Sequence, residues 1–188
     1  MIKMLLKKNA FLIIPLAHML ISLFFDKKYL QGRFFEKGYG GYLWALRSIV
    51  QKNILRLGPP MPWPTGLTCH VSNPSNITFH PDDLNNFQSP GTYFQNFKGH
   101  IYLGFGSYIS PNVGIITAGH KLDNLNEHEE GMDVVIGKEC WIGMNAVIMP
   151  GVTLGDRTIV ASCSVVNKSF PQGGIIIGGA PAKVIKKI

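Results

Sequence analysis

From Leu103 onward the chain places an aliphatic residue at every sixth position, and this period limits the folds open to it. The matching residues form two runs: Leu103, Ile109 and Ile115, then Ile136, Ile142, Ile148, Leu154, Val160 and Val166. A period of six fits neither the 3.6-residue turn of an α-helix nor the two-residue alternation of one strand. The chain must therefore turn a corner once in each repeat. This predicts a solenoid of short strands around a column of aliphatic side chains.

Five stretches carry a family resemblance: residues 109–113, 118–120, 141–143, 150–156 and 178–185. Through them residues 97–188 resemble the hexapeptide-repeat acyltransferases, and among these most of all the sugar and polysaccharide O-acetyltransferases. The resemblance implies a mainly β fold, a left-handed parallel β-helix with three hexads to each coil, so that the second run builds about two coils. It also implies a homotrimer with active sites between subunits. Acetyl-CoA is then a cosubstrate, and no cofactor is bound permanently.

Composition divides the chain into a basic helical segment (residues 1–57), a Pro- and Asn-rich linker with loops (58–96) and the repeat domain (97–188). Val71 and Ile77 are six residues apart and predict an incomplete coil within the linker, and Phe97 is expected to join the main column. The first 60 residues hold ten Lys or Arg and two acids, within a net charge of +7. These cations flank apolar runs and are not interleaved with aromatic platforms, so we expect no nucleic-acid partner.

Two apolar segments lie among these cations. Residues 10–25 carry no formal charge, but they are short for a spanning helix, which needs about 20 residues. Residues 42–57 predict an amphipathic helix with a basic side; its apolar stripe is Leu43, Leu46, Val50, Ile54 and Leu57, and Arg47, Lys52 and Arg56 lie off it. Either both helices cap the solenoid or contact neighbouring subunits, or they lie peripherally on the inner face of the cytoplasmic membrane. The protein itself is expected in the cytoplasm.

Chemistry is expected where the period breaks. Between Ile115 and Ile136 about fifteen residues exceed one hexad, so they must bulge out of the solenoid, and loops on rigid scaffolds often carry function. This insertion contains His120. Acetyl transfer to a hydroxyl needs a base near neutral pH, which imidazole provides. In the family that the chain resembles, the histidine that ends a stretch such as residues 117–120 performs this role.

Further site residues follow from the insertion and from the resemblance. Asp123 is a candidate to orient the imidazole and His128 to contact the acceptor. Asn96 or Gln95 is a candidate to bind a sugar, and Trp141 to form part of the groove wall or the subunit interface. The resemblance places the CoA groove at Ser110, Met144, Ser162, Asn167, Lys168, Lys183 and Lys186. The spacing of His100, His120 and His128 does not favour a zinc site, so no metal is expected. Cys140 stands at a small-residue position of the repeat and is interpreted as a packing residue.

The sequence therefore predicts an acetyl-CoA-dependent O-acetyltransferase that modifies a sugar hydroxyl of a cell-surface polysaccharide or a lipid-linked glycan precursor. Direct transfer is expected, since no strong nucleophile and base pair is evident. N-acetylation of an amino sugar or antibiotic, acetylation of serine, and a non-catalytic β-helix scaffold remain as alternatives.

Overall fold

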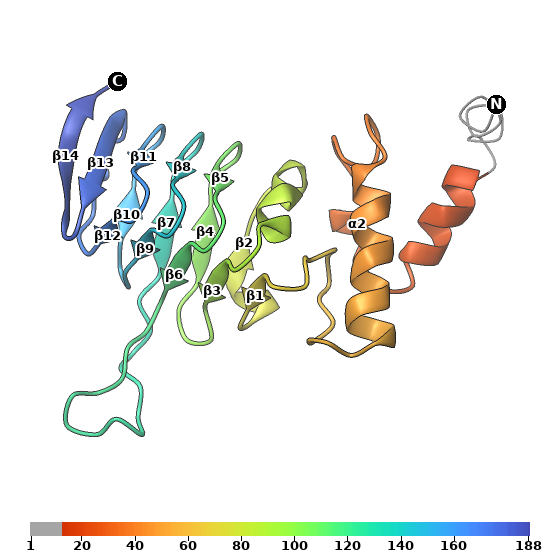
Figure 1. Ribbon diagram of the computed structural model, residues 1–188, viewed down its shortest axis with the longest axis horizontal. Helices are drawn as coiled ribbons and strands as arrows, with labels where there is room; N and C mark the ends of the chain where they lie inside the picture. Colours follow the sequence, from red (N-terminus) through yellow and green to blue (C-terminus); the bar gives the residue numbers. More distant parts are fainter. Residues whose placement is uncertain (1–12) are drawn as a thin grey trace. The chain divides into compact units, whose positions relative to one another are not determined.

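A computed structural model describes residues 13–188 (Figure 1), and these fall into two compact units that divide between Thr65 and Gly66. Residues 1–12 lie outside the described part, and with them Lys7, Lys8 and the start of the apolar run of residues 10–25. Each unit is described by itself below.

The second unit is a parallel β-helix whose strands stack into three sheets, called here faces A, B and C. Face A consists of β1 (His70–Val71), β3 (Tyr93–Gln95), β6 (Gly114–Ile116), β9 (Val147–Ile148) and β12 (Val165–Val166). Face B consists of β2 (Ile77–Thr78), β4 (Ile101–Leu103), β7 (Val134–Ile136) and β10 (Thr153–Leu154). Face C consists of β5 (Tyr108–Ile109), β8 (Trp141–Ile142), β11 (Ile159–Val160), β13 (Ile175–Gly179) and β14 (Ala182–Lys187).

The chain visits faces A, B and C in turn, and all strand pairs are parallel except β13 with β14. The aliphatic residues of the six-residue period lie in register on successive rungs, as Ile109, Ile142 and Val160 do on face C. All nine are buried. The predicted fold class, a parallel β-helix of hexapeptide repeats with an N-terminal helical segment, is confirmed, and the second run builds the expected two coils.

Glycine is required where successive coils stack most closely. A Cβ atom added to Gly104 would lie 2.3 Å from the backbone carbon of Gly137. This distance is far below van der Waals contact, so a larger residue would force the coils apart. Gly104 and Gly137 each follow an aliphatic residue of face B and allow the corners between faces B and C to stack closely.

The β-helix begins earlier than expected. Val71 and Ile77 do start a coil, but β1 and β2 belong fully to faces A and B, and a 3-10 helix, η4 (Pro81–Gln88), replaces the strand on face C. The strands of the β-helix therefore start within the segment predicted as linker with an incomplete coil, although this first coil lacks the hexad signal on one of its three sides. A short 3-10 helix, η3 (Pro74–Asn76), turns the chain between β1 and β2.

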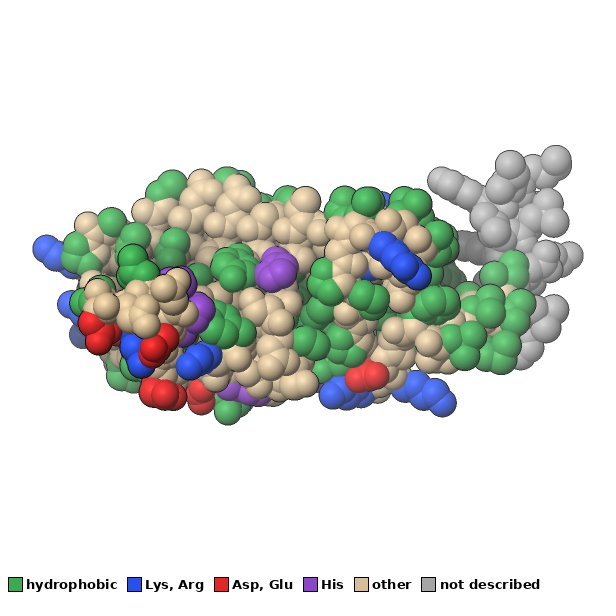
Figure 2. All heavy atoms as spheres, turned by 90° about the horizontal axis from the view of Figure 1, so that it is seen from below, with side chains coloured by type: hydrophobic (Ala, Val, Ile, Leu, Met, Phe, Trp, Pro, Cys, Tyr) green, Lys and Arg blue, Asp and Glu red, His purple; other side chains and the backbone are tan. Residues whose placement is uncertain are grey.

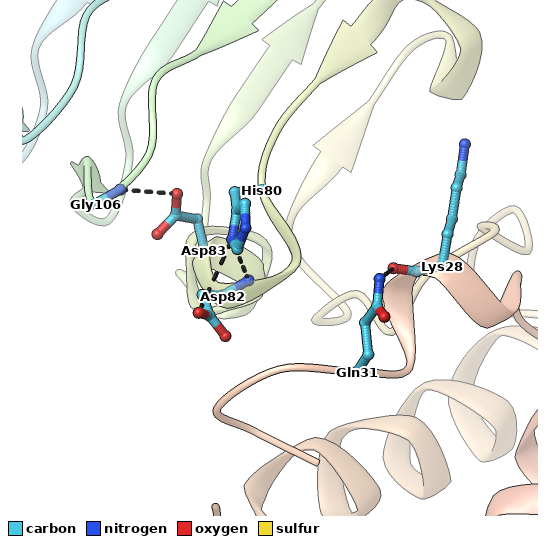
Figure 3. A network of polar contacts seen from close by, with 6 residues as sticks. All are labelled: Lys28, Gln31, His80, Asp82, Asp83 and Gly106. Carbon is cyan, nitrogen blue, oxygen red and sulfur yellow. Dashed lines mark hydrogen bonds and ion pairs between the residues drawn. The ribbon is translucent and has the colours of Figure 1, made fainter. Parts of the chain in front are cut away.

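Side chains of η4 replace the missing strand by pairing with the next coil. The Asn86 side chain donates to the Ser107 carbonyl and accepts from Ile109 N–H, both at 2.9 Å. The Asp83 carboxylate accepts from Gly106 N–H at 3.0 Å, and His80 Nδ1 accepts from Asp82 N–H at 3.1 Å at the start of the helix (Figure 3). The helix thus satisfies the edge of face C, which otherwise would expose unpaired backbone groups.

Phe97 does not join the aliphatic column, so that prediction is wrong. The inward residue of the preceding strand, β3, is Phe94, which pairs with Ile115 on face A and is fully buried. Nine positions separate Phe94 from Leu103, because the corner between β3 and β4 contains extra residues. Phe97 lies in this corner with 37% of its surface exposed.

The first unit is helical at residues 13–21, then contains η1 (Lys27–Tyr29), α2 (Gly40–Ser48) and a π-helical continuation, η2 (Ile49–Ile54). Its core includes Phe25, Tyr29, Phe35, Ala45 and Trp63. The predicted helix of residues 42–57 is present, but its apolar stripe faces outward. Within residues 13–188, no helix has the length and apolar character needed to span a bilayer.

Candidate functional site

The insertion predicted from the broken period forms a loop, residues 117–133, between β6 and β7 (Figure 1). It leaves the β-helix at the corner between faces A and B. Met132 N–H donates to the Thr117 carbonyl at 2.8 Å, which closes the base of the loop. The tip is held by a hydrogen-bonded pair between Lys121 N–H and the Glu127 carbonyl (3.0 Å) and by an ion pair between the side chains of the same residues.

Gln95, at the end of β3, holds the loop base with its side chain. Its Oε1 atom accepts the N–H groups of Thr117 (3.0 Å) and Ala118 (3.2 Å), and its Nε2 group donates to the Ala118 carbonyl (3.0 Å). The Thr117 hydroxyl is buried and donates to the Gln95 carbonyl at 2.8 Å. The first loop residues before His120 are therefore fixed to the rigid scaffold.

His120 is exposed, and its Nδ1 atom lies 2.7 Å from the carbonyl oxygen of Leu125. A carbonyl oxygen only accepts hydrogen bonds, so in the neutral ring Nδ1 carries the proton. The lone pair then belongs to Nε2, the atom available to take a proton from a substrate. The loop thus selects the tautomer that a general base at Nε2 requires.

His128 packs beside this imidazole and does not bond to it. The two rings lie 4.3 Å apart at an interplanar angle of 34°, and the backbones of both residues form an isolated antiparallel bridge. The other side of His128 meets the Phe97 ring edge-on at 4.8 Å. His128 is therefore positioned to limit the movement of the His120 ring.

Asp123 does not orient His120, contrary to the prediction, because the Leu125 carbonyl occupies Nδ1. Its side chain is exposed in the loop. Every residue has a backbone carbonyl, so the sequence does not show which one lies beside His120. A nearby carboxylate, Asp123, was therefore the candidate that the sequence offered.

Asn96 is also not available to an acceptor as the sequence suggested. It is 0% exposed, and its side chain accepts from Asn73 N–H (2.9 Å) and donates to the carbonyls of Asn73 (2.7 Å) and Asn76 (3.0 Å). Every polar atom of the amide is used to tie the first two coils together. The burial of this position in the corner between β3 and β4 was not visible from the sequence.

Several predicted donor residues gather at the corner between faces C and A. Ser110, Met144 and Ser162 follow β5, β8 and β11, and backbone bonds such as Cys163 N–H to the Met144 carbonyl (2.9 Å) stack these corners. The Met144 and Ser162 side chains are exposed. Trp141 Nε1–H donates to Ser110 Oγ at 3.1 Å.

A cavity of about 480 Å³ opens beside this corner. Its walls come from η4 and from face C: Asn85, Ser89, Tyr108, Ile109, Ser110 and Trp141. The structure thus brings Ser110 and Trp141 together in one concave surface, where aromatic rings meet hydroxyl and amide groups. Asn85 and Ser89 were not predicted, because η4 and the residue after it gave no repeat signal, and Tyr108 was not predicted as a site residue either.

The remaining predicted donor residues fall into two groups. Lys183 and Lys186 lie exposed on β14, the outer strand of face C, opposite Gly178 and Ile176. Asn167 and Lys168 follow β12 at the corner between faces A and B, and the Lys168 ammonium lies 5.5 Å from the centre of the Phe170 ring. Of these predicted cations, Lys183 and Lys186 therefore lie on face C, whereas Lys168 lies at the corner between faces A and B.

Cys140 is a packing residue, as predicted. It is buried, its thiol donates to the Gly155 carbonyl at 3.3 Å, and burial raises the pKa of this thiol. A raised pKa keeps the group protonated and a poor nucleophile at neutral pH. Within residues 13–188, no three His, Cys, Asp or Glu side chains are grouped so as to hold a metal ion.

Fold and loop geometry define a hexapeptide-repeat β-helix with a histidine-bearing insertion. Residues 133–168 match the family described as bacterial transferase hexapeptide (six repeats), so this part of the chain is similar to that family. The match confirms the resemblance that the sequence indicated.

Three curated relatives match over 91 residues, 47% of this chain. A putative acetyltransferase of Saccharomyces cerevisiae, YJL218W, is 42% identical over 46% of its own length. The galactoside O-acetyltransferase of Escherichia coli is 34% identical over 44% of its length. The putative colanic acid biosynthesis acetyltransferase WcaF of the same species is 36% identical over 48%. The matched region is about half the length of each of these relatives.

Replacing Gln95 with leucine tests the anchoring of the loop. The change removes three hydrogen bonds at residues 117 and 118, but the Thr117 amide keeps its bond to the Gln95 backbone carbonyl (3.0 Å). We therefore expect faster hydrogen exchange of the Ala118 amide and a turnover at least about 10-fold lower. Exchange measured by mass spectrometry and kcat measured with saturating substrates check both effects. Gln172→Leu, an exposed glutamine of the same unit, should change neither. Unchanged exchange in the Gln95 variant would contradict the anchoring role.

Proposed function

We propose that the protein is an acetyl-CoA-dependent O-acetyltransferase that modifies a sugar hydroxyl. The proposed acceptor is a cell-surface polysaccharide or a lipid-linked glycan precursor, in a bacterial cytoplasm and at the inner face of the membrane. The observation that carries the proposal is the contact between His120 Nδ1 and the Leu125 carbonyl, which leaves Nε2 as a base close to the anchored base of the loop.

In the proposed reaction, Nε2 of His120 takes the proton of the acceptor hydroxyl while the oxygen attacks the thioester carbonyl of acetyl-CoA. The tetrahedral intermediate then expels the CoA thiolate, and the imidazolium returns the proton to the sulfur. The Leu125 carbonyl holds the ring throughout, since Nδ1–H remains its donor. A positioned base of this kind contributes about 10²- to 10⁴-fold to the rate.

Direct transfer is favoured over a covalent acetyl-enzyme. Cys140 is buried, and its raised pKa keeps the thiol protonated and a poor nucleophile at neutral pH. Within residues 13–188 of one chain, Cys163 lies at the corner between faces C and A and has no imidazole beside it to activate its thiol.

The proposed site is shared between copies of the chain. His120 leaves the β-helix at the corner between faces A and B, whereas Ser110, Met144 and Ser162 lie at the corner between faces C and A. Face A separates the two corners within one chain. A second copy that brings its own C and A corner to the loop completes the site, and the closed arrangement proposed is a homotrimer.

The names of relatives support the acceptor class. One relative is a galactoside O-acetyltransferase and another a putative colanic acid biosynthesis acetyltransferase, so both are linked to sugars. Proton removal by imidazole also serves acetylation of an amino sugar, an antibiotic amine or serine, which are the alternative enzyme functions. A scaffold without catalysis is the remaining alternative.

Incubation with acetyl-CoA and a panel of glycans, free and lipid-linked, tests the proposal. We expect release of CoA together with a mass increase of one acetyl group on a glycan and an ester that is cleaved by mild base. An amide product, which resists mild base, would favour amine acetylation. If no glycan in the panel stimulates the release of CoA, the proposed transfer to a glycan is contradicted.

Mixing two inactive variants tests the shared site. His120→Ala removes the base, and Ser162→Trp fills the proposed donor corner, so each homo-oligomer should be inactive. Unfolding and reassembly of an equal mixture should restore a measurable fraction of wild-type turnover, because some interfaces combine an intact base with an intact donor corner. No recovery in mixed oligomers, verified by mass spectrometry, would contradict a site between copies.

A further inference from the structure

The apolar stripe of α2 and η2 faces outward although most of the large aliphatic side chains of this segment belong to it. Leu43, Leu46, Val50, Ile54 and Leu57 are 38–66% exposed. The opposite, buried side consists mainly of small residues, Gly41, Ala45 and Ser48, together with Ile49 and Lys52. The usual distribution, in which large aliphatic residues are inside, is thus reversed.

Close packing determines this orientation. The Phe35 ring lies so near α2 that a Cβ atom added to Gly41 would come within 2.7 Å of it. The ring also contacts Tyr42 edge-on at 5.2 Å. A leucine could not replace the small residues on this side, and rotation of the helix would bring the stripe into the same narrow space. The exposed stripe therefore follows from the core of the unit itself.

A second helix of the same unit adds to the exposed apolar surface. In the helix of residues 13–21 and the turn after it, the exposed residues recur at helical spacing: Ile13, Leu16, Met19, Leu20, Leu23 and Phe24. Leu23 is 76% exposed. His18, on the other side of this helix, contacts Tyr42 of α2, with 3.3 Å between Nδ1 and the hydroxyl oxygen. The two helices are neighbours, and each carries an uncovered apolar side.

Cations accompany both stripes. Lys27 and Lys28 follow the first helix, Arg47 lies beside Leu46, and Arg56 follows η2; all four are exposed. Residues 13–65 contain seven Lys or Arg and two acids. Figure 2 shows hydrophobic side chains gathered on the N-terminal part of the visible face, with Lys and Arg side chains beside them. Apolar side chains next to cations match a bilayer surface with anionic headgroups.

We infer that these two helices form a docking surface for an anionic lipid bilayer. The aliphatic side chains enter the boundary between headgroups and acyl chains, and Lys27, Lys28, Arg47 and Arg56 lie near lipid phosphates. The charge favours lipid over a second copy of the chain, because two copies joined through this face would bring equal positive charges together. The role of this surface in the cell rests on the proposed function, because a lipid-linked acceptor would lie in the same bilayer.

Flotation of the full chain with vesicles tests the surface. We expect binding to vesicles of phosphatidylcholine with about 30% phosphatidylglycerol, and weaker binding to phosphatidylcholine alone or at high salt. The double variant Leu46→Glu, Ile54→Glu should lower binding to the anionic vesicles at least about 10-fold, because it places two carboxylates in the stripe. Both positions are exposed, so thermal stability should not fall.

The matched control places two glutamates at exposed aliphatic positions of the other unit, Leu122→Glu and Ile185→Glu, and should retain vesicle binding. If Leu46→Glu, Ile54→Glu leaves vesicle binding intact, or only changes the molecular mass measured by light scattering, the stripe is not a lipid surface. Turnover on a soluble acceptor is measured separately. Vesicle binding without acetyl transfer would contradict the proposed function but not the docking surface. Acetyl transfer without vesicle binding would contradict the docking surface but not the proposed function.

Discussion

His120→Ala should lower turnover at least about 100-fold, which corresponds to about 2.7 kcal/mol of transition-state stabilisation. The variant removes the base at Nε2 while the loop keeps its anchors at Gln95 and Thr117. Steady-state kinetics of CoA release with a saturating acceptor measure the loss. We expect KM for acetyl-CoA to change little, since His120 is not among the residues proposed to bind CoA.

The comparison variants for this experiment are His70→Ala and His120→Gln. His70 is exposed at the start of the β-helix and should be neutral. Glutamine at position 120 can still donate to the Leu125 carbonyl but cannot accept a proton near neutral pH, so it should be as inactive as alanine. Turnover within a few-fold of the unaltered protein in either His120 variant would remove this residue from the mechanism.

Ile142→Ala should destabilise the β-helix by about 2–5 kcal/mol, the cost of a cavity in a packed core. Ile142 is 0% exposed and lies in register between Ile109 and Val160, so its loss leaves the column open on one rung. Urea unfolding at constant protein concentration, followed by circular dichroism, measures the change.

Ile159→Ala is the matched comparison, because Ile159 occupies the same face but points outward and is half-buried. We expect it to cost about 1 kcal/mol or less. Equal losses in the two variants would mean that the inward column is not what stabilises the coils.

The hexad period allowed much of the β-helix to be predicted. The burial of a residue such as Ile148 can be predicted from its place in the period, because inward positions recur at fixed spacing and are occupied by apolar side chains. The same rule located the loop of His120 as a departure from the period. Only an incomplete first coil was predicted, from Val71 and Ile77, since η4 satisfies face C with Asn86 and Asp83 and needs no aliphatic hexad there.

Details of the site depended on contacts that no spacing describes. The Leu125 carbonyl, and not Asp123, orients His120. Gln95 and Asn96 are adjacent amides in sequence, yet one anchors the loop and the other is buried between coils. Side-chain type alone does not distinguish these roles, because they depend on which backbone groups lie within hydrogen-bonding distance.

By itself, the sequence determined that residues from about 100 onward stack as coils, and that the histidine-bearing segment leaves them. These properties depend on spacing along the chain, so they can be recognised in the amino-acid sequence alone. The tertiary structure alone decided the tautomer of His120, the separation of its loop from the donor corner by face A, and the outward direction of the stripe on α2. Each depends on groups distant in sequence that meet only when the chain is folded.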